Sequence, residues 1–336
     1  MGGKNLNVTM WNKIGKLSFA VLVCCCACAA QQNVAVERKG NQIEVTIGGK
    51  PFTTYHFDPV VAKPYLMPLR SAQGTIVTRG FPIGNDASAG NPRDSSFEPH
   101  QRPLYFAHGN IDGLDFWGEE AFARYYDDHG RQDYGHMVLE KIDEASGGDA
   151  GVIKAEFSLE GPGGRVIGEE TQAFAFRGDD QTRIIDCAFT VHATHGPLTF
   201  GDSKEGTFGI RVAKELDSPP AHMVNSLGAE GEKTIWGKRA DWVNYDGKVD
   251  GEDVGIAVFD HPKSFRHPTT WHARGYGLFA ANPFGLRDFT RDPNQDGSWT
   301  IPERKSLTFR YRVVIHHGDY KAAHIAEAYQ KYAAEP

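Results

Sequence analysis

The sequence Leu307-Thr-Phe-Arg-Tyr-Arg-Val-Val-Ile315 alternates between apolar and polar side chains. Every second residue is apolar, and the charged Arg310 and Arg312 fall between these positions. The same period of two recurs in Val152-Ile-Lys-Ala-Glu-Phe-Ser-Leu159. Such alternation is typical of strands in an antiparallel sheet with one buried face. These segments therefore predict a mostly β protein.

Turn-forming clusters such as Gly161-Pro-Gly-Gly164 and Arg177-Gly-Asp-Asp180 separate the strands. Residues 320–334 differ, because their apolar side chains recur at helical spacing after Asp319, a suitable N-cap. No linker of biased composition and no fixed-period repeat interrupts residues 33–336. We therefore predict one large antiparallel β-sandwich domain over residues 33–336, closed by a C-terminal α-helix.

The N-terminus has the pattern of an export signal. Lys13 and Lys16 precede an apolar run that begins at Leu17 and ends in small residues around Ala27-Cys28-Ala29. The run is too short for a spanning helix, which needs about 20 apolar residues. We predict that residues 1–30 are a secretory signal peptide and that the protein is periplasmic or secreted.

Four of the five cysteines, Cys24, Cys25, Cys26 and Cys28, lie inside this signal. Simple cleavage is the favoured interpretation, and a lipoprotein with Cys28 as the lipid acceptor is the alternative. Cys187 remains alone in the mature chain, so no intramolecular disulfide is available. Cys187 falls on the apolar side of an alternating segment, which predicts a buried small hydrophobe.

The charge balance restricts the partners. The chain has 36 Lys plus Arg against 43 Asp plus Glu, a net charge of −7. Such a balance lacks the excess of positive charge that binding to a nucleic-acid backbone requires. No segment after the signal is long and apolar enough to cross a bilayer. The expected partner is a small-molecule or oligosaccharide ligand.

Four polar segments are embedded in the apolar frame: residues 97–117, 201–206, 259–262 and 271–277. In a strand, His272, Arg274 and Tyr276 would project from one face. His and Tyr can transfer protons, and Arg can stabilise an anion, which suits a polyhydroxylated or carboxylated ligand. The alternative is that any single His among them is a hydrogen-bonded structural residue with no role in a site. The predicted catalytic residues are His100, His108, Glu205 and His272, and the predicted substrate-binding residues are Arg102, Asp112, Trp117, Lys204, Arg211, Arg274 and Tyr276.

We expect no cofactor, and two metal alternatives stay open. After the predicted signal peptide, the sequence has neither His-Glu-x-x-His nor Cys-x-x-Cys, which would indicate zinc, although three distant His could form an open site. Residues 292–303 fit the spacing of a calcium loop, with candidate ligands Asp292, Asn294, Asp296 and Glu303. The neighbouring segments leave little room for the flanking helices of an EF-hand, so a tight turn at Asp296-Gly297 is the favoured interpretation.

Several motifs resemble the PmoA-like family, a bacterial domain of unknown function whose members are often labelled methane oxygenase. The motifs are residues 63–69, 77–79, 107–117, 201–211, 236–242, 255–262, 271–277 and 281–285. The family's Asp-His-Pro-His-His-Arg block is here Phe97-Glu-Pro-His-Gln-Arg102. Glu98 and Gln101 replace two His of that block, so the resemblance carries over only His100 and Arg102.

A fainter resemblance concerns the fold. The segment His108-Gly-Asn-Ile-Asp-Gly-Leu-Asp-Phe-Trp117 is similar to a block of the aldose epimerases. That resemblance implies a galactose mutarotase-like β-supersandwich, in which sugars bind on a concave sheet face.

The sequence thus favours an exported carbohydrate-active protein that transfers protons on a sugar, as an epimerase, lyase or dehydratase does. A glycosidase is less favoured, because no pair of acids stands out. A non-catalytic glycan-binding module and a metal-dependent oxygenase are the alternatives. Whether His100, His108, Lys204, Glu205, His272 and Arg274 line one pocket would discriminate among them.

Overall fold

The computed structural model describes residues 1–2, 31–80, 98–125 and 133–336. The predicted signal peptide, with the candidate lipid acceptor Cys28, lies outside the described residues except for Met1 and Gly2. In the part of the chain that is described, no helix has the length and hydrophobicity needed to span a bilayer.

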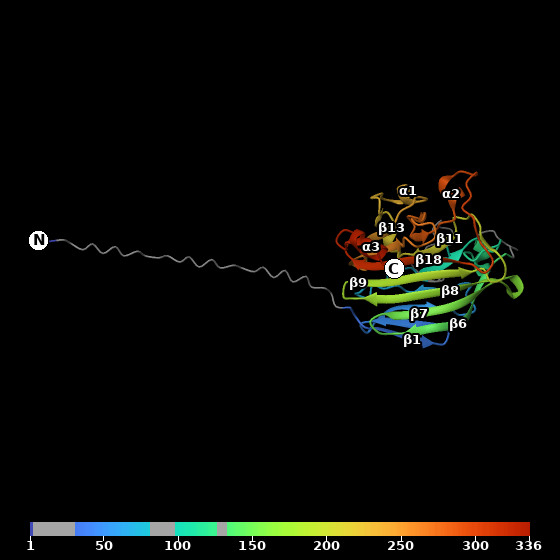
Figure 1. Cartoon of the computed structure of the whole chain (residues 1–336), viewed down its shortest axis with the longest axis horizontal. Helices are drawn as coiled ribbons and strands as arrows, with labels where there is room; N and C mark the ends of the chain where they lie inside the picture. The colour runs from blue at the N-terminus through green and yellow to red at the C-terminus, as the bar shows by residue number, and fades with distance from the viewer. Residues whose placement is uncertain (3–30, 81–97, 126–132) are drawn as a thin grey trace.

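Two large antiparallel sheets form the framework of the described chain (Figure 1). The first consists, in spatial order, of β1 (Val34–Lys39), β2 (Gln42–Ile47), β3 (Lys50–His56), β4 (Tyr65–Met67), β5 (Leu104–His108), β11 (Gly206–Arg211), β16 (Leu278–Ala281) and β15 (Trp271–Ala273). The second consists of β12 (His222–Asn225), β13 (Trp242–Val249), β14 (Glu252–Asp260), β18 (Ser306–His317), β9 (Thr182–His192), β8 (Arg165–Gly178), β7 (Gly151–Gly161) and β6 (His136–Ser146).

The remaining elements are short. Strands β10 (Leu198–Phe200) and β17 (Trp299–Ile301) pair with each other. The α-helices of the described chain are α1 (Glu232–Ile235), α2 (Leu286–Thr290) and α3 (Ile325–Ala333). The predicted fold class, mostly β with large antiparallel sheets and a C-terminal helix, is therefore confirmed.

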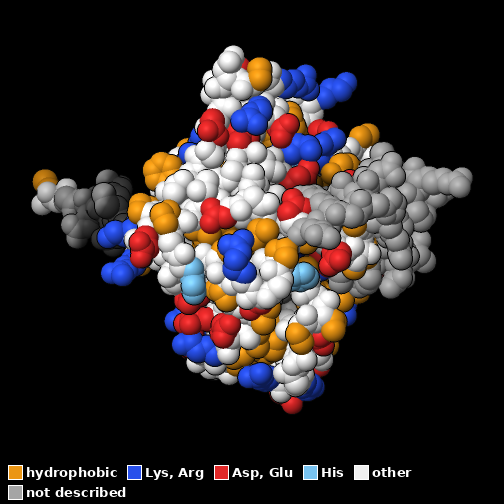
Figure 2. Space-filling view, turned by 90° about the vertical axis from the view of Figure 1, so that its right-hand side faces the viewer, with side chains coloured by type: hydrophobic (Ala, Val, Ile, Leu, Met, Phe, Trp, Pro, Cys, Tyr) orange, Lys and Arg blue, Asp and Glu red, His pale blue; other side chains and the backbone are white. Residues whose placement is uncertain are grey.

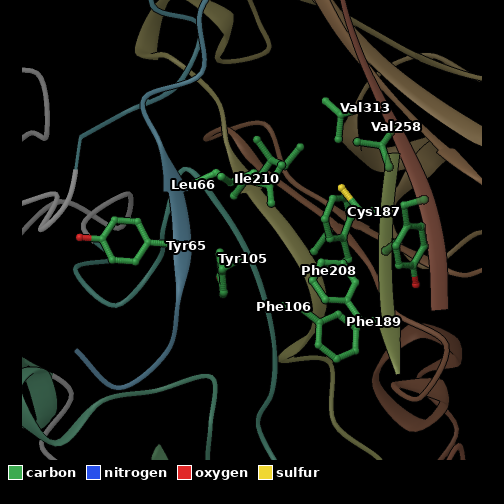
Figure 3. Packing of buried hydrophobic residues seen from close by; sticks show 14 of the residues in the cluster. Tyr65, Leu66, Tyr105, Phe106, Cys187, Phe189, Phe208, Ile210, Val258 and Val313 are labelled. Carbon is green, nitrogen blue, oxygen red and sulfur yellow. The ribbon is translucent and has the colours of Figure 1, made fainter. Parts of the chain in front are cut away.

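Aromatic side chains join the two sheets. Phe106 of β5 stacks on Phe189 of β9, with ring centres 4.4 Å apart, and Phe208 of β11 stacks on Tyr311 of β18 at 4.7 Å. Figure 3 shows Phe106, Phe189 and Phe208 packed together. Cys187 lies in the same core, as predicted, and is 3% exposed. Burial of large aromatic rings from both sheets is the main stabilising contribution of this core.

The second half of β18 is buried on both faces, whereas simple alternation predicts only one. Helix α3 accounts for the difference, because its Tyr329 and Tyr332 pack with Val314 and Phe259 on the outer face of the sheet. This helix begins five residues later than the sequence predicts. The Asp319 carboxylate accepts hydrogen bonds from the backbone N–H groups of the turn at 321–322, and helical geometry follows only after that turn.

The surface mixes charges of both signs. On the face shown in Figure 2, basic and acidic side chains are interspersed, with apolar side chains between them. The face shown therefore has no extended area of only positive or only negative charge.

A series of hydrogen-bonded polar side chains is buried between the sheets. The Tyr55 hydroxyl donates to Gln172 Oε1 at 2.8 Å, and Gln172 Nε2 donates to Glu170 Oε1 at 2.7 Å. Glu170 is fully buried, and its Oε2 atom has no hydrogen-bond partner among the described residues. Burial raises the pKa of Glu170 to about 8, although the hydrogen bond from Gln172 opposes the shift. Glu170 is therefore protonated in the folded protein at neutral pH.

This shift predicts how stability depends on pH. The unfolded chain releases the Glu170 proton near pH 4.5 and the folded chain near pH 8. The free energy of unfolding should therefore fall as pH rises between these values, by up to about 5 kcal/mol. Glu170→Gln should flatten this part of the curve, which urea unfolding of both proteins between pH 5 and 9 would measure. Parallel curves for the two proteins would contradict the assignment.

Candidate functional site

A pocket of about 400 Å³ lies beside the edge of the first sheet formed by β11, β15 and β16. Seven predicted site residues line it: His100, Trp117, Lys204, Glu205, His272, Arg274 and Tyr276. Five further residues that the sequence analysis did not assign also line it with their side chains: Glu98, Gln101, Asp115, Glu119 and Tyr134. The volume is within the usual range for small-molecule sites.

His272 lies on β15 and is 2% exposed. Its Nδ1–H donates to the backbone carbonyl of Lys204 at 2.8 Å. The Asn282 amide donates to the same carbonyl at 2.9 Å, so this oxygen is held in place. A hydrogen bond of this kind fixes the tautomer of the ring and leaves Nε2 with a lone pair. Nε2 is buried and has no hydrogen-bond partner in the described part of the chain.

Burial favours the neutral form of His272. Burial lowers the pKa of His272, while Glu205 and the Lys204 carbonyl only partly oppose the shift. For Glu205, burial is the largest single effect and disfavours ionisation. The nearby His272, Lys204 and Arg274 outweigh it and lower the pKa of the Glu205 carboxyl. At neutral pH the pocket therefore holds a neutral imidazole beside an ionised carboxylate, whose Oε1 lies 2.7 Å from Lys204 Nζ.

His108, predicted to be catalytic, is not among the lining residues. Its ring lies between Phe200 and Phe284, and burial lowers its pKa to about 4. Its Nε2–H donates to the Gly201 carbonyl at 2.8 Å, and the Gly109 N–H donates to the Glu205 carbonyl at 2.7 Å. The structure therefore makes His108 a positioning residue that supports the 201–205 loop from behind.

Arg274 and Tyr276 reach the pocket from a turn, because β15 ends at Ala273. The prediction that they share a strand face with His272 is therefore wrong in its geometry, although all three line the pocket. Glu232 of α1 holds the turn: its Oε1 lies 2.8 Å from Arg274 Nε, and its Oε2 accepts from the Gly275 N–H at 2.6 Å. Arg274 Nη1 and Nη2 have no hydrogen-bond partner among the described residues, so they are available to a ligand.

Tyr276 is held between cationic neighbours. The guanidinium carbons of Arg211 and Arg274 lie 4.8 Å and 5.3 Å from its ring centre. Burial raises the pKa of Tyr276 to about 12, so the phenol keeps its proton. Arg211 lies behind the lining residues, where it donates to Gln101 Oε1, and burial lowers its pKa to about 10.

An ion-pair cluster forms the wall near Trp117. The buried Glu119 carboxylate pairs with Lys63 at 3.1 Å and with Arg102, which lies behind the lining residues. Lys63 also donates to the Trp117 carbonyl at 2.5 Å. Burial lowers the pKa of Lys63 to about 8 even though Glu119 opposes the shift. Burial also lowers the pKa of His100, and the nearby cations add to the effect. This wall therefore holds a second neutral imidazole.

The structure does not bring Asp112 to the pocket. Asp112 is exposed in a turn, where its carboxylate accepts from the Thr199 N–H at 2.8 Å. This hydrogen bond, to a residue 87 positions away in the chain, accounts for the Asp112 carboxylate without a ligand.

In the candidate calcium loop, aspartate carboxylates accept hydrogen bonds from backbone N–H groups two residues further along the chain. Asp292 accepts from the Asn294 N–H and Asp296 from the Ser298 N–H, both at 2.9 Å. Glu303 lies beyond β17, 3.5 Å from Arg304. Over the ranges that the structure describes, no group of three or more His, Cys, Asp or Glu is arranged to hold a metal ion.

Sequence reasoning missed Glu119, Lys63 and Asn282. Lys63 and Asn282 occur in the conspicuous motifs at 63–69 and 281–285, and Glu119 follows Trp117 by two residues. No local signal shows that Glu119 meets Lys63, because they are separated by 56 positions and meet only in the fold.

Residues 42–330 match the model of a family of unknown function, DUF6807. The chain belongs to the DUF6807 family. No curated protein sequence matches this DUF6807 chain. The family model therefore places the chain in DUF6807 and does not show the predicted resemblance to the PmoA-like family.

Several solved structures are similar to this DUF6807 protein. A galactose mutarotase-like protein from Clostridium acetobutylicum is 12% identical, with 85% of this chain and 99% of that one covered and a TM-score of 0.43. A protein from Klebsiella pneumoniae assigned as an aldose 1-epimerase is 11% identical, with coverage of 91% and 92% and a TM-score of 0.41. An α-galactosidase from Lactobacillus brevis is 6% identical, with coverage of 91% and 42% and a TM-score of 0.38. Likeness of this degree assigns no activity.

Proposed function

We propose that this DUF6807 protein is an exported enzyme that binds a sugar or oligosaccharide and transfers protons on it, as an epimerase, lyase or dehydratase does. The observation that carries the proposal is His272, a buried imidazole at the pocket wall. Its Nδ1–H is occupied by the Lys204 carbonyl, and its Nε2 has no partner among the described residues. A neutral imidazole with one free nitrogen is suited to act as a general base.

The rest of the pocket suits a polyhydroxylated ligand. The ionised Glu205 accepts hydrogen bonds, while Lys204 and Arg274 donate them, so each hydroxyl finds a complementary group. The Trp117 indole Nε1–H is buried and has no acceptor among the described residues. A ligand oxygen would satisfy this donor, which is costly to leave unpaired.

The roles follow from the protonation states. His272 Nε2 removes a proton from a carbon next to a carbonyl or carboxylate, and the electron pair of the C–H bond moves onto oxygen. Arg274 balances the negative charge that develops there. In an epimerase a second acid, a role suited to the Tyr276 phenol, delivers a proton to the opposite face of that carbon. In a lyase or dehydratase the Tyr276 phenol protonates the departing oxygen, which leaves with the electrons of its bond to carbon.

Two other functions predict different outcomes. A glycan-binding module would bind the saccharide and leave it unchanged. A metal-dependent oxygenase, the activity that accompanies the PmoA-like resemblance, needs two His and one carboxylate around one metal. The described residues contain no group of three or more His, Cys, Asp or Glu arranged to hold a metal ion. Export is tested separately by N-terminal sequencing of the protein outside the cytoplasm, which should begin between residues 28 and 31.

The test is to incubate the purified protein with neutral and acidic monosaccharides and oligosaccharides and to follow the sugar signals by NMR. We expect new sugar signals from epimerisation or elimination. With the substrate found, kcat/KM should rise with pH through a pKa below 6.5, because His272 must be neutral and its pKa is lowered. Loss of the Tyr276 proton should not lower kcat/KM below about pH 10, because its pKa is raised to about 12. Binding without any product would contradict the proposed reaction.

A further inference from the structure

We propose that a second subsite, built to hold an acidic sugar unit, adjoins the first pocket across Arg274. The inference rests on the proposed function, because it assigns the class of saccharide that the enzyme takes. The subsite is a hollow of about 470 Å³ lined by Glu232, Lys233, Trp236, Arg274 and Arg291. Arg274 lines both pockets, so a ligand in the first can extend into the second.

The charged side chains of the second pocket are mostly cationic, whereas those of the first include both signs. The first is lined by the carboxylates of Glu98, Asp115, Glu119 and Glu205 against the cations Lys204 and Arg274. The second is lined by three cations and one carboxylate. That carboxylate, Glu232, already contacts Arg274 Nε and the Gly275 N–H. An oxyanion on the ligand is therefore attracted to the second pocket, where Lys233 and Arg291 have no carboxylate partner among the described residues.

The cations of the second pocket are available. The side chains of Lys233 and Arg291 form no ion pair within the described residues, and both residues are exposed. Arg274 offers Nη1 and Nη2 while Glu232 holds its Nε. A guanidinium with two available amino groups binds a carboxylate or a sulfate through two parallel hydrogen bonds. The chemistry therefore fits an anionic substituent of a saccharide.

Trp236 gives the subsite a half-buried aromatic surface. Its ring packs edge-on against Phe289 at 5.3 Å and against His272 at 6.2 Å. Its Nε1–H is buried and has no acceptor among the described residues. A sugar oxygen would supply that acceptor, while the indole ring would contact the apolar side of the sugar. Because Trp236 touches His272, the second sugar unit lies directly beside the unit on which the base acts.

The test uses D-glucuronate, D-glucose 6-sulfate and D-glucose as probes and the indole N–H signal of Trp236 as the readout. Trp236→Phe assigns that signal in a ¹H–¹⁵N NMR spectrum. Both anionic sugars, or one of them, should shift the signal saturably, with an affinity about tenfold or more above that of glucose. Comparing the two shows whether carboxylate or sulfate is preferred.

Lys233→Gln combined with Arg291→Gln should weaken binding of the anionic sugar about tenfold or more. Lys238→Gln combined with Lys305→Gln is the matched control. It removes the same charge from exposed positions outside both pockets, and affinity should be retained. His272→Asn should also retain binding, because the subsite itself is intact.

An unmoved Trp236 signal, or equal anion affinity in the Lys233/Arg291 variant, would overturn the subsite. Its failure and that of the proposed function are distinguishable. If anionic sugars bind at Trp236 but no saccharide is converted, the subsite stands and the reaction falls. If a neutral saccharide is converted and anions do not bind, the subsite alone falls.

Discussion

His272→Asn should lower kcat on the substrate identified by the NMR screen by about 10² to 10⁴-fold, the usual loss on removing a general base. Asparagine can still donate a hydrogen bond from its amide to the Lys204 carbonyl, which accepts from His272 Nδ1 at 2.8 Å. It has no nitrogen lone pair to replace Nε2. We therefore expect the fold and KM to change little while the chemical step is lost. Steady-state kinetics together with circular dichroism would measure both effects.

His195→Asn is the matched control. His195 is exposed and its Nδ1 lies 2.9 Å from the Thr194 hydroxyl, and it lines a different hollow. Activity should be unchanged in this variant. Full activity in both variants would show that His272 is part of the framework and that another group acts as the base.

Glu119→Ala should lower the free energy of unfolding by about 3 to 5 kcal/mol, the usual cost of removing one partner from a buried ion pair. The side chains of Lys63 and Arg102 are fully buried against Glu119. Without its carboxylate, two cations remain in the interior with no compensating charge from this residue. Burial already lowers the pKa of Lys63 to about 8, and loss of Glu119 should lower it further. Urea unfolding of the variant and the parent protein measures the effect.

A double-mutant cycle separates the ion pair from simple loss of packing. Lys63→Met and Glu119→Gln should each destabilise the protein, and together they should cost less than the sum of the two single changes. Glu303→Ala is the surface control, since Glu303 is exposed and contacts only the exposed Arg304 at 3.5 Å among the described residues. Additive effects in the cycle would mean that Lys63 and Glu119 are not energetically coupled.

Much of the fold follows from local pattern. The alternation in β18 and β7 and the apolar spacing in the C-terminal helix predict the class of protein, since each pattern is complete within one segment. The alternating pattern does not predict burial correctly where a helix packs on the outer face of a sheet as a third layer. The outer face of β18 becomes buried because α3 covers it, and one strand's sequence does not say which element packs on it.

The candidate site was only partly predictable. The polar segments around His100, Lys204 and His272 stand out in an apolar sequence, and the structure brings all three to one pocket. Asp112 belongs to an equally conspicuous segment, yet its carboxylate accepts a hydrogen bond from the distant Thr199 N–H and does not line the pocket. His108 supports the loop from behind. All of these residues are polar and lie in conspicuous segments, so residue type and local spacing do not separate the residues that line the pocket from those that support it.

The sequence by itself determined that the chain forms strands with one apolar face, that Cys187 is a core residue, and that proton-transferring side chains are concentrated in a few segments. The tertiary structure alone decided which of these side chains share a pocket and which nitrogen of His272 is free. The physical reason is that both depend on contacts between distant residues. The Lys204 carbonyl that fixes the His272 tautomer lies 68 positions away in the chain. Only pairing of β11 with β16, and of β16 with β15, places it within hydrogen-bonding distance.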